Sequence, residues 1–564
     1  MAENKIEFKG PFPSIIENLT DWPISRFYRD RKKIVEELGE LSYKSILEKY
    51  GDNLPDVLKQ TIHSETIRSK NIPWQVDPPD ELDYWKELGS EFKRIALTEE
   101  GQQAKYQDLC KKIIRRYAEE IPGDFVPKTF LFARKFLTRM FGAIYNPWYK
   151  KDQNGMWWGK RDEVLNKFKV TGPVEKIRSL FDRTSVVVVP THFSNLDSPL
   201  IGYGIETMTG LPAFSYGAGL NLYDYELAAY YISRLGAYKI DRRKRNGIYL
   251  NTLKEFSVIS FLKDLNTVFF PGGTRSRSGA LEDSLKYGLL GTLIEAQNYN
   301  YKNGLNKKVM IVPLVVSYHF IFEAEELVNQ HLRKEGRANY ISSKSKKKAS
   351  FFHLLQRFLK SDTEVYMSFG EPIDVFGNIL DDQGNSLKNG EIIDIEQHFI
   401  SEEKVTLDKQ RNDVYTRVLA QQIVESYKTE NVVLSSHVVA FSAYYLVEKK
   451  YSDLDKFTLL GLSSDQVELE KDNYHSLVRE LIEELKVMSV NGELKLAPIL
   501  HEDIEKVIDD GIKHLSSFHV NKPWYKTESK YKTMNLKVLY FYHNRLLGYD
   551  LKKRLQEKTE LISA

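Results

Sequence analysis

The spacing of hydrophobic and polar positions changes twice along the chain. Over residues 1–165, apolar residues recur at the spacing of amphipathic helices, as in the stretch from Ile24 to Tyr50. Over residues 166–375, short apolar runs alternate with stretches long enough to form helices. Over residues 376–564, a polar stretch rich in Asp, Gly and Asn leads into further helical patterns. The pattern predicts an α/β unit flanked by an N-terminal and a C-terminal helical region.

The central region carries the strand signals. The expected strands are residues 185–189, 237–240, 267–270, 309–316 and 365–369. Their alternation with helix-length stretches predicts a largely parallel sheet, and in such sheets ligands gather at the carboxyl ends of the strands. Pro313 interrupts one of these strands, and we expect it at a sheet edge or a bulge because proline cannot donate to the ladder.

His192 and Asp197 follow the first of these strands. Ser194 or Asn195 is expected to cap the next helix, which places Asp197 in its first turn, within reach of the His192 ring. A carboxylate there can hold one imidazole nitrogen protonated and leave the other free as a base. The alternative is that Asp197 is an acid favoured in a first helical turn by the helix dipole alone.

Two further strand ends carry basic residues. The loop from Val268 to Leu281 combines a glycine turn with Arg275 and Arg277, a combination that suits a phosphate. Its spacing differs from that of a nucleotide-binding P-loop. The other strand end places Lys239, Arg242 and Arg243 in one loop, which reads equally as a solvated basic turn.

Composition and charge exclude some classes of protein. The chain has 564 residues, 42% of them hydrophobic and 28% charged, so it is long enough for two or three folded units. The net charge of +3 gives no argument for nucleic-acid binding. The single cysteine, Cys110, fits a reducing cytoplasm. We expect no signal peptide and no membrane-spanning helix, because the sequence has neither an apolar leader nor an apolar run of about 18 residues.

Taken in order, four stretches resemble the four motifs of the glycerolipid acyltransferases. They are the His-x4-Asp pair, a Gly-x3-Ile-x-Arg block that begins at Gly236, the arginine loop, and the hydrophobic strand around Pro313. Weaker similarity covers roughly residues 170 to 550. The long helical flanks make the chain similar to the large glycerol-3-phosphate acyltransferases.

The resemblance implies a role for each matching residue. His192 and Asp197 would form the catalytic dyad. The implied substrate-binding residues are Arg275 and Arg277 for the phosphate, Arg242 as a second anion contact, Pro313 in the acyl-binding wall, and Gly273 near the amides that stabilise the oxyanion. One position departs from the family pattern, because Gly272 stands where the third motif usually carries a glutamate that helps to order the acceptor site.

The activity implied is acyl transfer from a thioester, acyl-CoA or acyl carrier protein, to a hydroxyl of glycerol 3-phosphate, the first step of phospholipid synthesis. Dihydroxyacetone phosphate and lysophosphatidate remain alternative acceptors. No cofactor or metal is expected, since no Cys or His cluster has the spacing of zinc ligands. Ser194 is a rival nucleophile, although Gly-x-Ser-x-Gly is missing. The departure at Gly272 keeps a second class open, a non-catalytic lipid-binding protein on the same scaffold.

A peripheral position on the cytoplasmic face of an anionic membrane is expected, because the implied product is a lipid. One contact segment is the stretch from Lys128 to Ile144, which a core-facing helix would match equally well. Its expected apolar arc is Phe130, Ala133, Phe136, Leu137, Met140, Phe141 and Ile144, and its basic arc is Lys128, Arg134, Lys135 and Arg139. The second segment is the Lys344–Lys348 cluster within the low-complexity stretch Arg333–Ser350.

Overall fold

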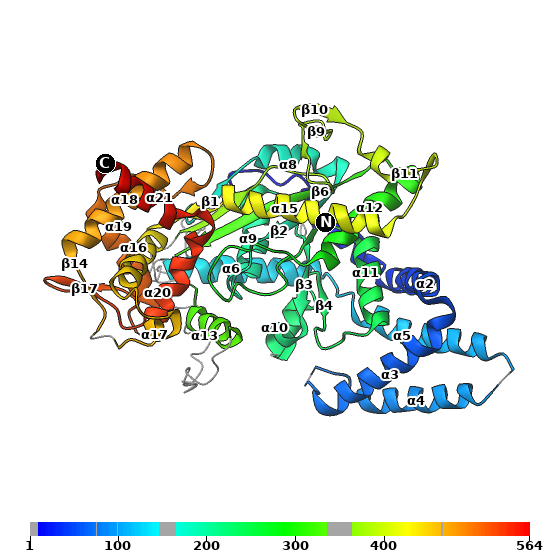
Figure 1. The fold of residues 1–564 in the computed structure, drawn as a ribbon. Coiled ribbons are helices and arrows are strands. Elements are labelled where there is room, and N and C mark those ends of the chain that lie inside the picture. The colour runs from blue at the N-terminus through cyan, green and yellow to red at the C-terminus, as the bar shows by residue number, and fades with distance from the viewer. Residues whose placement is uncertain are drawn as a thin grey trace, which may run out of the picture.

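A seven-stranded sheet lies at the centre of the molecule, with helices on both faces (Figure 1). The computed structural model describes residues 10–145, 165–335 and 364–563, except residues 75, 99, 225, 320, 464, 465 and 520. The strand order is β1-β7-β6-β2-β5-β3-β4, and all neighbours pair in parallel except β6 with β7. The strands are β1 (Phe168–Thr171), β2 (Thr184–Pro190), β3 (Ser215–Gly219), β4 (Ala237–Ile240), β5 (Thr267–Val268), β6 (Lys308–Tyr318) and β7 (Val365–Phe369). The predicted α/β fold class is confirmed.

Each expected strand lies within or around an observed one, but two strands of the seven-stranded sheet were not predicted. These are β1 and β3. The sequence of β3, Ser-Tyr-Gly-Ala-Gly, contains no apolar run, and β1 alternates lysine and threonine with apolar residues. Both strands are held by pairing with neighbours that lie far away in sequence, β1 with β7 and β3 with β4 and β5. Local hydrophobicity therefore could not reveal them.

Both faces of the sheet are buried, which explains the continuous hydrophobic run of β2. Val186 and Val188 face one core and Val187 and Val189 the other, because side chains alternate along a strand. The helices of the α/β unit are α8 (Val174–Leu180), α9 (Asp197–Thr209), α10 (Glu226–Ile232), α11 (Gly247–Leu262), α12 (Tyr287–Lys302) and α13 (Ala324–Lys334).

Pro313 lies in β6, an interior strand, so the expected edge position is wrong while the expected bulge is confirmed. Val189 pairs with it on the β2 side. On the β7 side the regular ladder stops at the pair Leu314–Phe369, and the next bridge joins Ile311 to Ile373, which leaves one extra residue on the strand opposite. The missing N–H of the proline therefore falls where the ladder is already interrupted.

The N-terminal helices pack against α11 and the strand β4 through a separate hydrophobic core. These helices are α1 (Pro23–Arg29), α2 (Arg31–Tyr50), α3 (Leu54–Asn71), α4 (Glu81–Ala96), α5 (Gln102–Glu120) and α6 (Pro127–Tyr145). In Figure 1, α2 to α5 form the blue group at the lower right, next to α11, whereas α6 is the cyan helix nearer the centre of the molecule. This arrangement places helices beside the basic loop that follows β4.

The C-terminal region shares one core with the sheet. Val188 and Val312 of the sheet belong to the same buried cluster as Val438, Leu481 and Leu539 of the C-terminal helices. The main helices there are α15 (Lys409–Thr429), α16 (Ser435–Lys450), α18 (Lys471–Val490), α19 (Ile504–Phe518), α20 (Leu536–His543) and α21 (Leu551–Ser563). Short strands β8 to β12 precede these helices and β13 to β17 lie between them, so the region is helical with small sheets rather than purely helical.

In helix α6, the buried and exposed side chains do not follow the predicted apolar and basic arcs. Phe130 and Leu137 pack against the cores as expected. Arg134 points inward and forms a 2.8 Å ion pair with the buried Glu206, because a buried carboxylate needs a partner, whereas Phe136 is 47% exposed. The assignment of Arg134 to an exposed basic arc was therefore wrong, whereas the exposure of Phe136 leaves the expected membrane contact through this residue a prediction. The side chains of α6 that follow Thr138 lie outside the described residues, and so does the Lys344–Lys348 cluster.

In the part of the chain that the structure describes, helices that combine the length and the apolarity needed to cross a bilayer are absent.

Candidate active site

His192 and Asp197 form a hydrogen-bonded pair just beyond the end of β2. Nδ1 of His192 lies 2.8 Å from Oδ2 of Asp197. The His192 side chain is 16% exposed and Asp197 is 1% exposed, so the imidazole reaches solvent while its partner is buried. The ring also stacks on Phe270, with 4.0 Å between centroids. This geometry fixes the ring and leaves Nε2 as the nitrogen available to a substrate.

Asp197 organises the loop that carries His192. Its Oδ2 accepts the backbone N–H groups of Phe193, at 2.6 Å, and Ser194, at 2.9 Å. The carboxylate thus folds the loop back over the start of α9. Leu196 occupies the N-cap position without a side-chain hydrogen bond, so the expected cap at Ser194 or Asn195 was wrong, and the first-turn position of Asp197 is confirmed.

Tyr318 also hydrogen-bonds to Asp197, and this residue was not predicted from the sequence. Its hydroxyl donates to Oδ1 of Asp197 at 2.5 Å. Burial, and then the charge of Asp197, raise the pKa of Tyr318 well above its usual value, so the phenol stays protonated and remains a donor. Tyr318 ends β6 as His192 follows β2, so its position at the end of a predicted strand was the available signal.

Ser194 is engaged in the structure of the loop. Its Oγ donates to Oε2 of Glu323 at 2.8 Å and accepts the N–H of Leu196 at 3.2 Å. Ser194 is fully buried, and Nδ1 of His192 is hydrogen-bonded to Asp197 and not to Ser194. The geometry therefore gives Ser194 no activating base, which disfavours the enzyme nucleophile as a rival.

The arginine loop runs directly beside His192. The N–H of Ser276 donates to the carbonyl oxygen of His192 at 2.7 Å. Gly273 has φ +75°, a conformation that favours glycine, and its N–H donates to the carbonyl of Phe270 at 3.0 Å. That amide is already used, so Gly273 itself does not supply the oxyanion donor expected near it. Within the described residues, the amides of Thr274 and Arg275 have no protein acceptor.

The three predicted arginines lie close together with different partners. Arg275 donates to Oε1 of Glu323 at 3.0 Å, which ties it to the His192 loop. Arg277 and Arg242 form no ion pair or hydrogen bond with any described residue. Partial burial, and then the charges of Arg275 and Arg277, lower the pKa of the Arg242 guanidinium. Three neighbouring cations, two of them without an acidic partner among the described residues, favour an anionic ligand.

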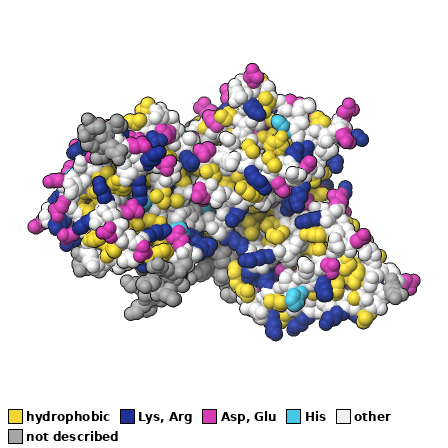
Figure 2. Space-filling view, viewed as in Figure 1, with side chains coloured by type: hydrophobic (Ala, Val, Ile, Leu, Met, Phe, Trp, Pro, Cys, Tyr) yellow, Lys and Arg dark blue, Asp and Glu magenta, His cyan; other side chains and the backbone are white. Residues whose placement is uncertain are grey.

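Arg243 and Lys239, the other two basic residues predicted at this strand end, have structural roles. Arg243 forms ion pairs with Asp77, at 2.5 Å, and Asp241, at 2.7 Å, and its guanidinium lies 4.0 Å from the ring centroid of Trp74. Burial lowers the pKa of Lys239, whose ammonium lies 5.4 Å from the ring centroid of Tyr223. Figure 2 shows Lys and Arg side chains gathered over β3, β4 and α11. Arg242 thus remains open to a ligand, and its charge is close enough to Arg275 and Arg277 to be affected by theirs.

Glu282 approaches the same site from the far end of the arginine loop. Its Oε1 accepts the backbone N–H of His192 at 2.9 Å. Its Oε2 is buried and has no hydrogen-bond partner among the described residues. Burial raises the pKa of Glu282 to about 7, with a smaller contribution in the same direction from Asp197 and an opposing one from Arg545.

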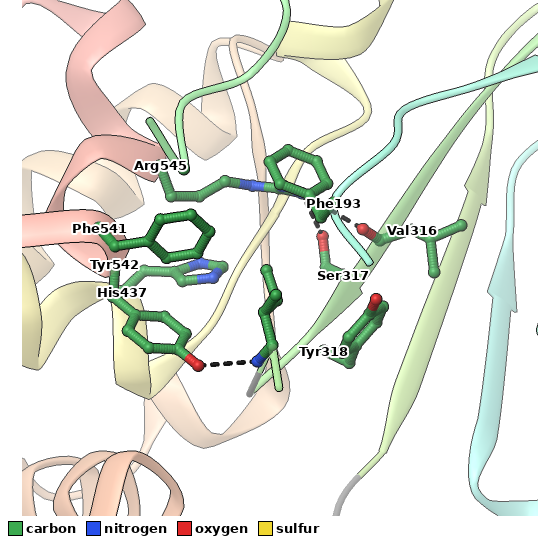
Figure 3. A pocket seen from close by; sticks show the side chains of 10 residues that line it. Phe193, Val316, Ser317, Tyr318, His437, Phe541, Tyr542 and Arg545 are labelled. Carbon is green, nitrogen blue, oxygen red and sulfur yellow. Dashed lines mark hydrogen bonds between the residues drawn. The ribbon is translucent and has the colours of Figure 1, made fainter. Parts of the chain in front are cut away.

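Arg545, from the C-terminal region, lies behind the dyad. Its guanidinium is buried 4.1 Å from the ring centroid of Phe193 and donates to Asn431 Oδ1 and Ser317 Oγ at 2.8 and 2.9 Å. Arg545 belongs to η9 (Asn544–Tyr549), the short helix that follows α20, and Figure 3 shows it beside a small cavity that Phe193 and Tyr318 also line. Burial lowers the pKa of Arg545 to about 10, so it remains a cation at neutral pH. No local pattern in the sequence indicated this residue.

One group of side chains has the composition of a metal site. His319 is far from Asp510 and His514 in sequence, yet the three residues place ligand atoms within 4.8 Å of one another. The two imidazoles stack face to face, with 4.0 Å between centroids. His319 is hydrogen-bonded to Ser436, and His514 to Asp510. Stacked rings do not aim their nitrogens at a common centre, so this arrangement fits a hydrogen-bonded network better than a coordination sphere.

Comparisons with known proteins agree with the motifs. The family model described as "Acyltransferase" matches residues 167–317. A glycerol-3-phosphate acyltransferase of Alteromonas mediterranea is 28% identical over 291 residues, 51% of this chain and 31% of the relative. Proteins of the same name from Pseudoalteromonas atlantica and Actinobacillus pleuropneumoniae are 26% identical over 303 residues and 24% identical over 394 residues.

These matches bear on how far the resemblance extends. The match to the Pseudoalteromonas atlantica protein covers 52% of this chain and 32% of that relative. The match to the Actinobacillus pleuropneumoniae protein covers 69% of this chain and 43% of that relative. The chain therefore spans about a third of the length of the first relative it matches. The predicted resemblance to glycerolipid acyltransferases is confirmed.

The raised pKa of Glu282 predicts a specific pH dependence of stability. The folded protein holds this proton up to about pH 7, and the unfolded chain only to about 4.5. The stability that the group contributes is therefore full below pH 4.5 and is lost as the pH rises through 7. Glu282→Gln removes this loss, so its free energy of unfolding should rise relative to wild type by up to about 3 kcal/mol between pH 4.5 and 8. Urea unfolding at several pH values measures the difference.

Asp283→Asn is the matched control for this measurement, because Asp283 is the exposed neighbour of Glu282. Its unfolding free energy should follow the wild-type pH curve. Parallel curves for wild type and Glu282→Gln would mean that Glu282 ionises at its ordinary pKa.

Proposed function

We propose that this protein transfers a fatty acyl chain from a thioester to a hydroxyl of glycerol 3-phosphate. The observation that carries the proposal is the pair His192–Asp197, joined at 2.8 Å beside a loop of arginines. The names of the relatives and the matched family model support the reaction class. Acyl-CoA and acyl carrier protein are both compatible donors.

In the proposed mechanism His192 is the general base. Nε2 accepts the proton of the acceptor hydroxyl as the oxygen attacks the thioester carbonyl carbon. Asp197 stabilises the imidazolium through Nδ1, and Tyr318 and two loop amides hold the aspartate in place. When the tetrahedral intermediate collapses, the C–S bond breaks, and His192 returns the proton to the departing thiolate. One C–O bond replaces one C–S bond, and the products are an ester and a free thiol.

The arginine cluster is the proposed site of the acceptor phosphate. Arg277 and Arg242 have no partner among the described residues, and Arg275 keeps donors beyond the one it gives to Glu323. The amides of Thr274 and Arg275 add neutral donors on the same loop. A phosphate bound there lies beside His192, because Ser276, between the two loop arginines, is hydrogen-bonded to the His192 carbonyl.

We also propose that the protein binds an anionic membrane surface through α6 and α10. Phe132 and Phe136 of α6 are 55% and 47% exposed, and Phe132 stacks on Tyr231 of α10 with 5.9 Å between centroids. Lys128 and Lys135 are exposed on the same helix. Exposed aromatic rings flanked by lysines are typical of a surface that lies at a lipid interface.

His192→Ala should lower kcat by about 10²–10⁴-fold without loss of the fold, because a general base contributes to the barrier and not to the core. The assay follows release of thiol from a labelled thioester in the presence of glycerol 3-phosphate. His63→Ala, on the exposed side of α3, is the matched control and should behave as wild type. A folded His192→Ala protein with wild-type turnover would remove the dyad from the mechanism.

The same assay separates the alternatives. A panel of glycerol 3-phosphate, dihydroxyacetone phosphate and lysophosphatidate identifies the acceptor by its lipid product. If purified wild-type protein releases no thiol with any of them while binding the lipids, the protein is a non-catalytic lipid-binding one.

Arg277→Ala should raise the KM for glycerol 3-phosphate by about 10-fold or more, since one charge-assisted hydrogen bond contributes about 1.5–3 kcal/mol. The KM for the thioester should stay within about two-fold of wild type. Steady-state kinetics with each substrate varied in turn makes the comparison, and Arg115→Ala, an exposed arginine on α5, serves as control. Equal increases in both constants would give the loop a structural role instead.

Vesicle sedimentation tests the membrane surface. The double change Phe132→Ser and Phe136→Ser should weaken binding to phosphatidylglycerol-containing vesicles at every salt concentration. Lys128→Glu with Lys135→Glu should weaken it mainly at low salt, because each basic residue contributes about 1 kcal/mol that salt screens. Leu97→Ser with Val490→Ser, two residues that are 88% and 89% exposed elsewhere, is the control. Wild-type protein that stays in the supernatant at low salt would contradict the proposal.

A further inference from the structure

Gly272 marks a position where the backbone does not require glycine. Twelve glycines of the described chain have positive φ, and Gly272 is not among them. The backbone conformation at this position therefore allows a side chain, and only the neighbouring atoms can exclude one. This matters because Gly272 stands at the place where the acyltransferases that the sequence resembles usually carry a glutamate.

The side chain of Glu282 fills the space beside Gly272. A Cβ atom built on Gly272 would lie 3.1 Å from Cγ and 3.3 Å from Oε1 of Glu282, and its three nearest neighbours all belong to that side chain. The carboxyl group of Glu282 thus lies where the side chain of residue 272 would project. From there its Oε1 accepts the N–H of His192 at 2.9 Å.

We propose that Glu282 positions the His192 loop, supplying from a later position in the chain the carboxyl group that residue 272 lacks. The proposal rests on the function proposed above, since it assigns the carboxyl group to the same site. It also answers the doubt that Gly272 raises about activity. The carboxyl group comes from a later position in the sequence but occupies the space into which a side chain at residue 272 would project.

The contacts of His192 show what this carboxyl group holds. The N–H of His192 is bound by Glu282, its carbonyl by Ser276, and its ring by Asp197 and Phe270. The backbone N–H is the anchor that sets the direction in which the imidazole leaves the chain. Without Glu282, this N–H loses its acceptor, and the backbone of His192 is held by Ser276 alone.

Glu282 acts through His192 and does not touch a substrate. Its Oε1 bonds to the backbone of His192 and its Oε2 is buried, so neither oxygen faces the side of the imidazole where Nε2 is free. The expected effect of losing it is a fall in kcat, with little change in the binding of the acceptor by the arginines.

Four variants test the proposal, with kcat, the KM for glycerol 3-phosphate and thermal unfolding measured for each. Glu282→Ala should lower kcat by about 5- to 150-fold, the loss of one acceptor from a buried donor. Glu282→Gln should restore most of this loss, because its amide oxygen can accept the same N–H. Gly272→Glu alone should destabilise the protein, since two side chains then compete for one space. Gly272→Glu combined with Glu282→Ala should recover activity relative to Glu282→Ala. Asp283→Ala, the exposed neighbour, should leave kcat unchanged.

Hydrogen exchange provides a readout that does not depend on the reaction. The peptide that contains residues 191–196 should exchange faster in Glu282→Ala than in wild type, and the double variant should return it to slow exchange. If wild-type protein shows this protection but transfers no acyl chain, the proposed function fails and the positioning role stands.

Three results would overturn the positioning role. They are wild-type kcat and exchange in Glu282→Ala, a Glu282→Gln protein as impaired as Glu282→Ala, and a folded double variant no better than Glu282→Ala.

Discussion

The buried carboxylate of Asp197 is the constraint on which the candidate site depends. It accepts the His192 ring, two loop amides and the hydroxyl of Tyr318, so all of its strong hydrogen-bonding directions are used. An ion with 1% exposure is tolerated only when it is fully hydrogen-bonded. The loop, the end of β6 and the start of α9 must therefore adopt one relative arrangement. That arrangement brings the imidazole to the surface beside the arginines.

The parts of the site that the sequence predicted are those with local signals. A β-branched run followed by His192 and Asp197, or by a glycine turn and Arg275, can be recognised without knowing what lies nearby, because strand ends of a parallel sheet converge. Strand β3 and the inward turn of Arg134 could not be recognised, since a partner distant in sequence decides each of them. The geometry of Pro313 was predicted in part, as a bulge.

Residues that support the dyad were missed for the same reason. Glu323 bonds to Ser194 and Arg275, and Arg545 packs on Phe193, yet nothing in the sequence around Glu323 or Arg545 distinguishes them from surface charges. Their roles follow from burial, which the sequence does not display for a single charged residue. Gly272 is the informative opposite case, in which a missing side chain in a motif directs attention to the side chain that fills its space.

The contacts of Arg545 have a consequence for how the protein is made. The guanidinium donates to Ser317 next to Tyr318, and the carbonyl of Phe541 lies so close to Gly279 that a side chain there would collide with it. During translation the sheet and the arginine loop leave the ribosome well before Arg545 and Phe541 do. Until Arg545 has been synthesised, Phe193 and Ser317 lack the guanidinium that contacts them, so the candidate site is complete only after the C-terminal region has been added to the sheet.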